Sequence, residues 1–145
     1  KTNPKTIPRQ LLKHFPMAIL EPKPSRTAFS IEIKALKLFL TGSIKTFNFQ
    51  YNLQLKPIGT PFEKSVWSQL RKIPYGTTIS YKELASKINR KNSFRAVGTA
   101  CGKNPIPIVI PCHRVIKSDS SLGGFSSGEK IKKTLLDLEN TYKDS

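Results

Sequence analysis

Residues 80–102 read SYKELASKINRKNSFRAVGTACG, and this stretch decides the fold. Ser80 is followed three residues later by Glu83, which is the spacing of a capping box at a helix start. The apolar residues after the box recur at helical spacing as far as Ile88. The pattern therefore predicts a short helix from this box to about Ile88.

A second short helix follows after a tight polar turn at residues 89–92. Ser93 can cap this helix, which we expect to run from Phe94 to about Gly102. Two short helices joined by such a turn are typical of a helix-turn-helix, although a plain helical hairpin gives the same pattern.

Helices are also predicted on both sides of this stretch. Residues 60–63, TPFE, form another capping box with proline at the first helical position. A last helix is expected from about Glu129 to Asn140, where apolar residues recur at helical spacing. The C-terminal part of the chain is therefore expected to be mainly helical.

The N-terminal part has a different pattern. Five prolines make residues 1–27 extended or loop-like, and a helix is expected over residues 31–40. Alternating apolar residues predict a half-buried strand over 46–55, followed by a linker at 56–59.

The predicted fold class is α/β in two parts. We expect a small, reduced N-terminal α/β subdomain over residues 1–55. A C-terminal, mainly helical domain with a helix-turn-helix of winged-helix type is expected over residues 56–145. The length of 145 residues suits one ordinary domain or two small ones.

Charge is the first indication of a partner. The chain carries 25 basic and nine acidic residues, a formal net charge of +16. This balance favours a polyanion, either nucleic acid or an anionic membrane surface. A lysine-rich proteome would give a similar balance, since 19 of the 25 basic residues are lysine.

Several classes are disfavoured by composition. The longest uncharged apolar run, residues 105–112, is too short to cross a bilayer, and no signal peptide pattern opens the sequence. Two cysteines exclude a disulfide scaffold, and with two histidines they make a zinc site unexpected. We therefore expect a cytoplasmic protein without metal or membrane contact, or a nuclear one in a eukaryote.

Residues 106–115, IPIVIPCHRV, carry the chemistry. The two prolines predict a rigid, extended backbone that ends in Cys112, His113 and Arg114. Cationic neighbours favour the thiolate, which is the nucleophilic form of cysteine. An inert buried thiol is the alternative. A cysteine hydrolase fits poorly, because its base usually comes from elsewhere in the sequence.

The segment PCHRV at 111–115 resembles the active-site signature of O6-alkylguanine-DNA alkyltransferases, also called methylated-DNA–protein-cysteine methyltransferases. The resemblance covers roughly residues 56–142, with further matching motifs in the family's order. These motifs are Gly59–Phe62, Val66–Trp67, Ile73–Gly76, Ser80–Tyr81, Leu84–Ala85, Arg95–Gly98, Asn104–Pro105, Gly123–Phe125 and Leu135–Leu136.

The resemblance implies repair of double-stranded DNA by direct damage reversal, without a cofactor. Cys112 would accept the alkyl group from O6 of guanine, irreversibly and once per chain. His113 would act as a base through a water and would be oriented by Glu139. Asn104 would hold the active-site turn by hydrogen bonds. Tyr81 would donate to the guanine ring and crowd a phosphate, which helps the base leave the stack.

The resemblance also assigns DNA contacts. Arg95 would fill the space of the flipped base, with the helix-turn-helix in the minor groove of DNA bound by a monomer. The carbonyl groups of Cys112 and Val115 would read the guanine amino group, and Ser126 would lie near O6. Further DNA- or base-contacting residues would be Ser93, Phe94 and Arg114.

Two alternatives stay open beside this hypothesis. A non-catalytic lesion-binding protein of the alkyltransferase-like kind is opposed by Cys112 together with His113 and Glu139. A cysteine hydrolase or redox protein is opposed by the Arg95 helix and the charge. Cys101 is interpreted as a core thiol rather than a second reactive site. Trp67 is assigned to the core by its helical spacing.

Overall fold

The computed structural model describes residues 30–46 and 59–144. Both predicted capping boxes are present in it and start helices. Helix α3 (Pro61–Leu70) begins where Glu63 N donates to Thr60 Oγ1 at 3.2 Å and Thr60 N donates to Glu63 Oε2 at 2.8 Å. Helix α4 (Tyr81–Lys87) begins with the same reciprocal pair between Ser80 and Glu83. Local sequence alone thus sets both helix starts.

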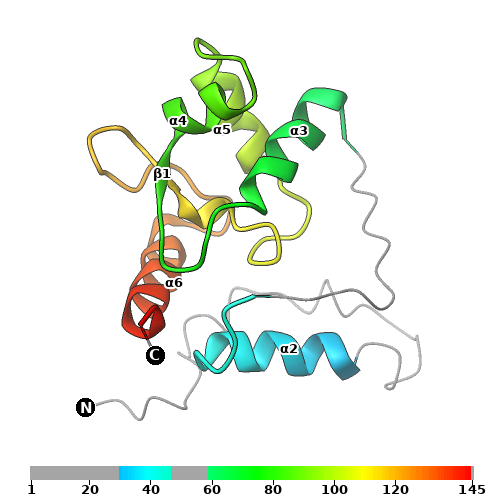
Figure 1. Cartoon of the computed structure of the whole chain (residues 1–145), viewed down its shortest axis with the longest axis vertical. Helices are drawn as coiled ribbons and strands as arrows, with labels where there is room; N and C mark the ends of the chain where they lie inside the picture. Colours follow the sequence, from blue (N-terminus) through cyan, green and yellow to red (C-terminus); the bar gives the residue numbers. More distant parts are fainter. Residues whose placement is uncertain (1–29, 47–58, 145) are drawn as a thin grey trace.

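Helix α5 (Phe94–Gly102) follows α4 after a short turn, so the predicted pair of helices is confirmed (Figure 1). Asn89 in the turn has a φ of 57°, in the left-handed region that asparagine tolerates. Ser93 is the N-cap residue of α5, but its side chain makes no capping hydrogen bond. The expected cap is wrong in this respect, because Ser93 lacks the extended backbone that capping requires.

A first core cluster joins α3, α4 and α5. Trp67 is buried in it, as predicted, and its Nε1 donates to the carbonyl oxygen of Ala100 on α5 at 2.8 Å. The members on these three helices are Val66, Trp67, Leu70, Leu84, Ala85, Val97, Ala100 and Cys101. This packing fixes α5 against α3 and leaves the start of α5 exposed.

Two short parallel strands connect the start of α4 to the chemical segment. Strand β1 (Ile79–Ser80) pairs with β2 (Val115–Ile116), with Ile79 opposite Val115. Between residues 59 and 144 the structure has no third named strand, so the winged-helix type stays a prediction. The described part is therefore mainly helical with little strand.

Residues 106–111 form a tight loop, which contradicts the extended backbone that the sequence predicted. Ile110 N donates to the carbonyl oxygen of Ile106 at 3.0 Å, and Ile108 has a φ of 75°. Asn104 holds both ends of this loop by hydrogen bonds to Ile106 and Ile110, and Ile108 and Ile110 are buried in different core clusters.

The second core cluster joins helix α2 (Ser30–Leu40) to helix α6 (Glu129–Tyr142). Phe39 and Leu40 pack there with Ile131 and Leu135 of α6 and with Ile108. Both helices were predicted. The expected loop at 1–27, strand at 46–55 and linker at 56–59 lie wholly or almost wholly outside the described residues. None of the described helices is long and apolar enough to cross a membrane.

Candidate active site

A single 3₁₀ turn, η2 (Cys112–Arg114), carries the chemical segment between the two core clusters. Arg114 N donates to the carbonyl oxygen of Pro111 at 3.1 Å, and Cys112 N donates to that of Ile110 at 2.8 Å. All three side chains of the turn are buried. The three consecutive residues therefore point into protein, and each has its own partners.

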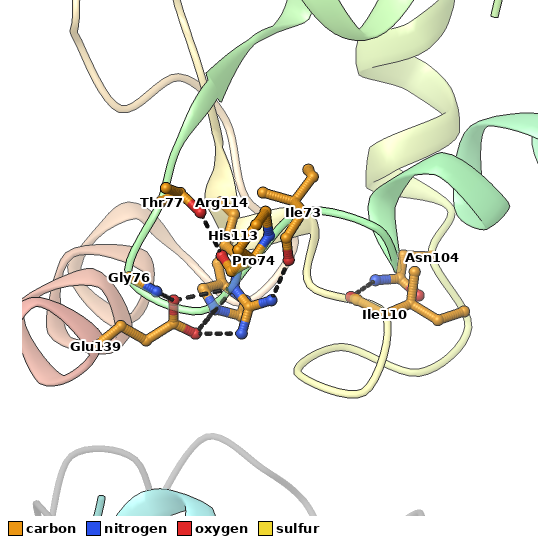
Figure 2. Close-up of polar contacts among 9 residues, drawn as sticks. All are labelled: Ile73, Pro74, Gly76, Thr77, Asn104, Ile110, His113, Arg114 and Glu139. Carbon is orange, nitrogen blue, oxygen red and sulfur yellow. Dashed lines mark hydrogen bonds and ion pairs between the residues drawn. The ribbon is translucent and has the colours of Figure 1, made fainter. Parts of the chain in front are cut away.

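Glu139 of α6 lies at the centre of a buried network, shown in Figure 2. Its Oε1 is 2.8 Å from His113 Nε2, and its two oxygens accept from Arg114 Nε at 3.1 and 2.9 Å. Arg114 Nη2 donates at 2.9 Å and Gly76 N at 3.0 Å. Burial raises the pKa of Glu139, but the hydrogen bonds from His113 and Arg114 outweigh it and hold the pKa at about 2. Glu139 is thus an ionised carboxylate.

This carboxylate decides the tautomer of His113. An ionised carboxylate only accepts hydrogen bonds, so His113 Nε2 must carry the proton. Nδ1 then has the lone pair, and it is buried without a hydrogen-bond partner among the described residues. Burial lowers the pKa of His113, against the opposing effect of Glu139. His113 is therefore a neutral imidazole whose free nitrogen can take up a proton.

Arg114 belongs to this network, which contradicts the prediction that it binds DNA. Its side chain is 7% exposed and pairs with Glu139, and Nη1 donates to the carbonyl oxygen of Ile73 at 2.6 Å. Its guanidinium carbon also lies 5.6 Å from the centre of the Tyr75 ring. The positive charge of Arg114, which the sequence analysis assigned to DNA binding, is thus paired with Glu139.

Asn104 connects the loop to the thiol of Cys112. Its Nδ2 donates to the carbonyl oxygen of Ile110 at 2.6 Å and to Cys112 Sγ at 3.0 Å, and its Oδ1 accepts from Ile106 N at 3.0 Å. Figure 2 shows the bond to Ile110. Together the three bonds close the loop before the turn and direct a donor at the sulfur.

The thiol of Cys112 is not held as a thiolate at rest. Burial raises its pKa, and the Asn104 hydrogen bond and the charge of Lys132 only partly oppose this. The expectation that adjacent His113 and Arg114 favour the thiolate is therefore wrong: His113 is neutral and Arg114 is compensated by Glu139. The sulfur needs a base to become nucleophilic.

Cys112 opens onto a cavity of about 490 Å³. Tyr81 and Ser126 line this cavity, together with Phe94 at the start of α5. Burial raises the pKa of Tyr81 to about 12, with further increases from Cys101 and Cys112, so its hydroxyl is a neutral donor. The Tyr81 hydroxyl lies 3.4 Å from the carbonyl oxygen of Gly124.

The α5 face towards the cavity includes two glycines, Gly98 and Gly102, which carry no side chain into it. A Cβ at Gly98 would meet only the Tyr81 ring, at 3.8 Å, and one at Gly102 would meet nothing within 4 Å. Arg95 is exposed on the same helix, and Phe94 is 48% exposed, the only exposed large hydrophobic residue in the described ranges. Ser93 is half-buried.

The sequence interpretation missed Lys132, which is fully buried on α6. Its Nζ donates to the carbonyl oxygen of Val115 at 2.5 Å, the group expected to read guanine. The available signal was spacing: Lys132 precedes Leu135 by three residues and Glu139 by seven, so all three share one helix face. In the ranges 30–46 and 59–144, no three His, Cys, Asp or Glu residues gather to hold a metal ion.

Comparison with known proteins gives a consistent result. Residues 61–141 match the family described as 6-O-methylguanine DNA methyltransferase, DNA binding domain. A methylated-DNA–protein-cysteine methyltransferase of Methanosarcina barkeri is 49% identical over 106 residues, which are 73% of this chain and 65% of the relative. A Mycobacterium bovis relative of the same name is 40% identical over 126 residues, 82% of this chain and 74% of its own. The chain thus spans less than two thirds of the Methanosarcina barkeri relative.

Solved structures agree with the sequence comparison. Mycobacterium tuberculosis OGT in complex with DNA superposes with a TM-score of 0.72 at 38% identity, covering 83% of this chain and 76% of that one. An O6-methylguanine-DNA methyltransferase from Pyrococcus kodakaraensis gives a TM-score of 0.66 at 38% identity, covering 90% and 73%.

Proposed function

The chain belongs to the 6-O-methylguanine DNA methyltransferase family, and on this premise we propose that it repairs DNA by transferring the O6-alkyl group of guanine to Cys112. One observation carries the proposal, and it is the buried arrangement around Cys112. Its thiol accepts a hydrogen bond from Asn104, and the adjacent His113 is hydrogen-bonded to Glu139. The thiol opens onto a cavity, and the neighbouring base has a free nitrogen.

The reaction proceeds by one displacement. The S–H proton of Cys112 passes through a water to Nδ1 of His113, since a buried polar atom without a protein partner is commonly satisfied by water. The sulfur attacks the methyl carbon, forming a C–S bond as the C–O6 bond breaks. The electron pair of that bond stays on the guanine, which takes one proton from the neutral Tyr81 hydroxyl. The proton held by His113 leaves through water and restores the tyrosine, so that no net charge remains. A methyl thioether and unmodified guanine result.

DNA enters over the exposed start of α5. A base inside a duplex is unreachable and must leave the stack. Arg95 fills the resulting space, and the aromatic ring of Phe94 contacts the strand at the cavity mouth, in the way apolar wedges act in minor-groove complexes. Ser93 and the exposed cations of the turn, Arg90 and Lys91, contact phosphate. Ser126, exposed at the cavity, lies near O6.

The carbonyl groups of Cys112 and Val115 read the guanine amino group in this proposal. That of Val115 already accepts from Lys132, and a carbonyl oxygen has a second lone pair for the base. Minor-groove binding by a monomer and a cytoplasmic location stay predictions.

Intact mass spectrometry tests the function. After mixing with excess duplex that contains O6-methylguanine, we expect one added methyl group per chain, on the peptide that carries Cys112. Cys112→Ala removes the methyl uptake and keeps DNA binding, while Cys101→Ala still accepts the methyl group. Repeated turnover by one chain, or the methyl group on Cys101, contradicts the assignment. DNA binding without any uptake by the unaltered protein would indicate a lesion-binding protein instead.

A further inference from the structure

Lys132 is the buried charged group that this reaction leaves without a role. Its side chain has no exposed surface, whereas lysine is almost never fully buried without a partner. Within residues 30–46 and 59–144 no carboxylate lies at ion-pair distance from it. The ammonium instead donates to two backbone carbonyl groups, those of Val115 and Leu122.

These contacts join the walls of the cavity. Val115 directly follows the turn that carries Cys112, and Leu122 directly precedes the segment 123–126, which also lines the cavity. The Lys132 ammonium also lies 5.7 Å from the centre of the Tyr81 ring, which lines the cavity from α4. One side chain thus connects three elements that would surround a flipped base.

The charge of Lys132 also acts on the sulfur. It lowers the pKa of Cys112, opposite to the larger effect of burial, and the cysteine in turn raises the pKa of the lysine. The titratable groups that face Lys132 are Tyr81 from α4, Cys101 from α5, Cys112 and His113 from η2, and Glu129 from its own helix. Glu129 is exposed, so no buried carboxylate competes for the ammonium.

We propose that Lys132 is a positioning residue for alkyl transfer: its ammonium fixes the Val115 and Leu122 carbonyl groups around the cavity and serves as the buried counter-charge to the Cys112 thiolate. The inference rests on the proposed function. It explains why a cation is buried here without a carboxylate, because a resident carboxylate would neutralise it before the thiolate forms.

The test measures the transfer rate from free O6-benzylguanine against pH, so that base flipping does not contribute. Lys132→Gln keeps a donor for a carbonyl group and removes the charge. We expect the midpoint of the rate profile to move upwards by about one pH unit, the low end of what a nearby opposite charge produces. This corresponds to about tenfold slower transfer at neutral pH. Lys132→Arg retains the charge and the wild-type midpoint.

Lys130→Met is the matched control, since Lys130 is exposed on the same helix and its replacement leaves the profile unchanged. A Lys132→Gln variant that melts at a lower temperature but keeps the wild-type midpoint overturns the proposal, because a purely structural lysine would behave in this way. Absence of transfer by the unaltered protein would instead refute the proposed function.

A measurement on the unaltered protein avoids any folding defect of the variants. Nitrogen-15 NMR of the Lys132 ammonium should show its resonance titrating together with Cys112. We expect that resonance to move when Cys112 is alkylated, because the sulfur can then no longer become negative. A resonance that alkylation leaves in place overturns the counter-charge role.

Discussion

Replacing Glu139 with glutamine tests the centre of the buried network. The amide matches the carboxylate in volume, so no cavity forms, but the charge is lost. Arg114 would stay buried at 7% exposure without its ion-pair partner. Removing one partner of a buried ion pair typically costs about 3–5 kcal/mol. For a domain of this size we expect the melting temperature to fall by roughly 10–15 °C.

The same change disables the proposed base. The new amide nitrogen can donate to His113 Nε2, which now accepts a hydrogen bond from the chain instead of donating one. The ring proton then resides on Nδ1, the nitrogen that must take up the thiol proton. We expect the transfer rate to fall by about 10²–10⁴-fold, the usual contribution of a positioned general base.

The assay is single-turnover transfer from free O6-benzylguanine, followed by intact mass at a temperature where every variant is folded. Asp137→Asn is the matched control on the same helix. Asp137 is exposed and its pair with Lys133 spans one helical turn, so its loss costs less than about 0.5 kcal/mol. If Glu139→Gln melts lower but transfers at the wild-type rate, Glu139 is purely structural and the tautomer argument fails.

Four further outcomes follow from the same geometry. Arg95→Ala slows repair of duplex DNA and leaves transfer from free O6-benzylguanine nearly intact; equal losses on both substrates would refute the finger role. Asn104→Leu removes the donor to the sulfur and raises the pH midpoint of transfer, which a thiol titration checks. Undamaged duplex binds with an affinity that falls steeply with salt, and a flat dependence would contradict phosphate contact. The Glu139 pKa of about 2 lies below the ordinary value of 4.5. The carboxylate therefore contributes its full stabilisation above pH 4.5, and this stabilisation is lost as the pH falls towards about 2. The free energy of unfolding of Glu139→Gln, measured against pH, should lack this loss.

The helices could be predicted because their signals are local. Each capping box is written in four consecutive residues, and the structure starts α3 and α4 at Thr60 and Ser80. The segment 106–111 shows where this reasoning fails. Its prolines restrict the backbone of single residues. The chain nevertheless turns back, because Asn104 bonds to both ends of the loop and Ile108 and Ile110 are buried in different core clusters. Those contacts are tertiary, so tertiary structure overrides the local preference.

The sequence named several of the residues that the fold brings together around Cys112, but it did not predict their charge states. The two residues that follow Cys112 in the sequence were expected to act as cations beside the thiol, and in the fold neither of them does. Arg114 is neutralised by Glu139, which is distant in sequence, and burial keeps His113 neutral. The cation that does act on the sulfur is Lys132, on another element. Charge state depends on burial and on three-dimensional neighbours, which residue order does not contain.

Under the proposed function each chain is used once, and the resting state of the thiol suits this use. A thiolate open to solvent would react with any alkylating agent or oxidant and consume the chain before it met a lesion. Burial keeps the Cys112 pKa high, so the sulfur is protected while the cavity is empty. Two groups that lower the Cys112 pKa, Asn104 and Lys132, are already in place around the sulfur. The proposed base, His113, is the next residue in the chain. Exclusion of water by an entering base would disfavour a free thiolate still further, because desolvation is already the largest effect on this pKa. Loss of the thiol proton and attack on the alkyl carbon are therefore expected to be closely coupled in the proposed reaction.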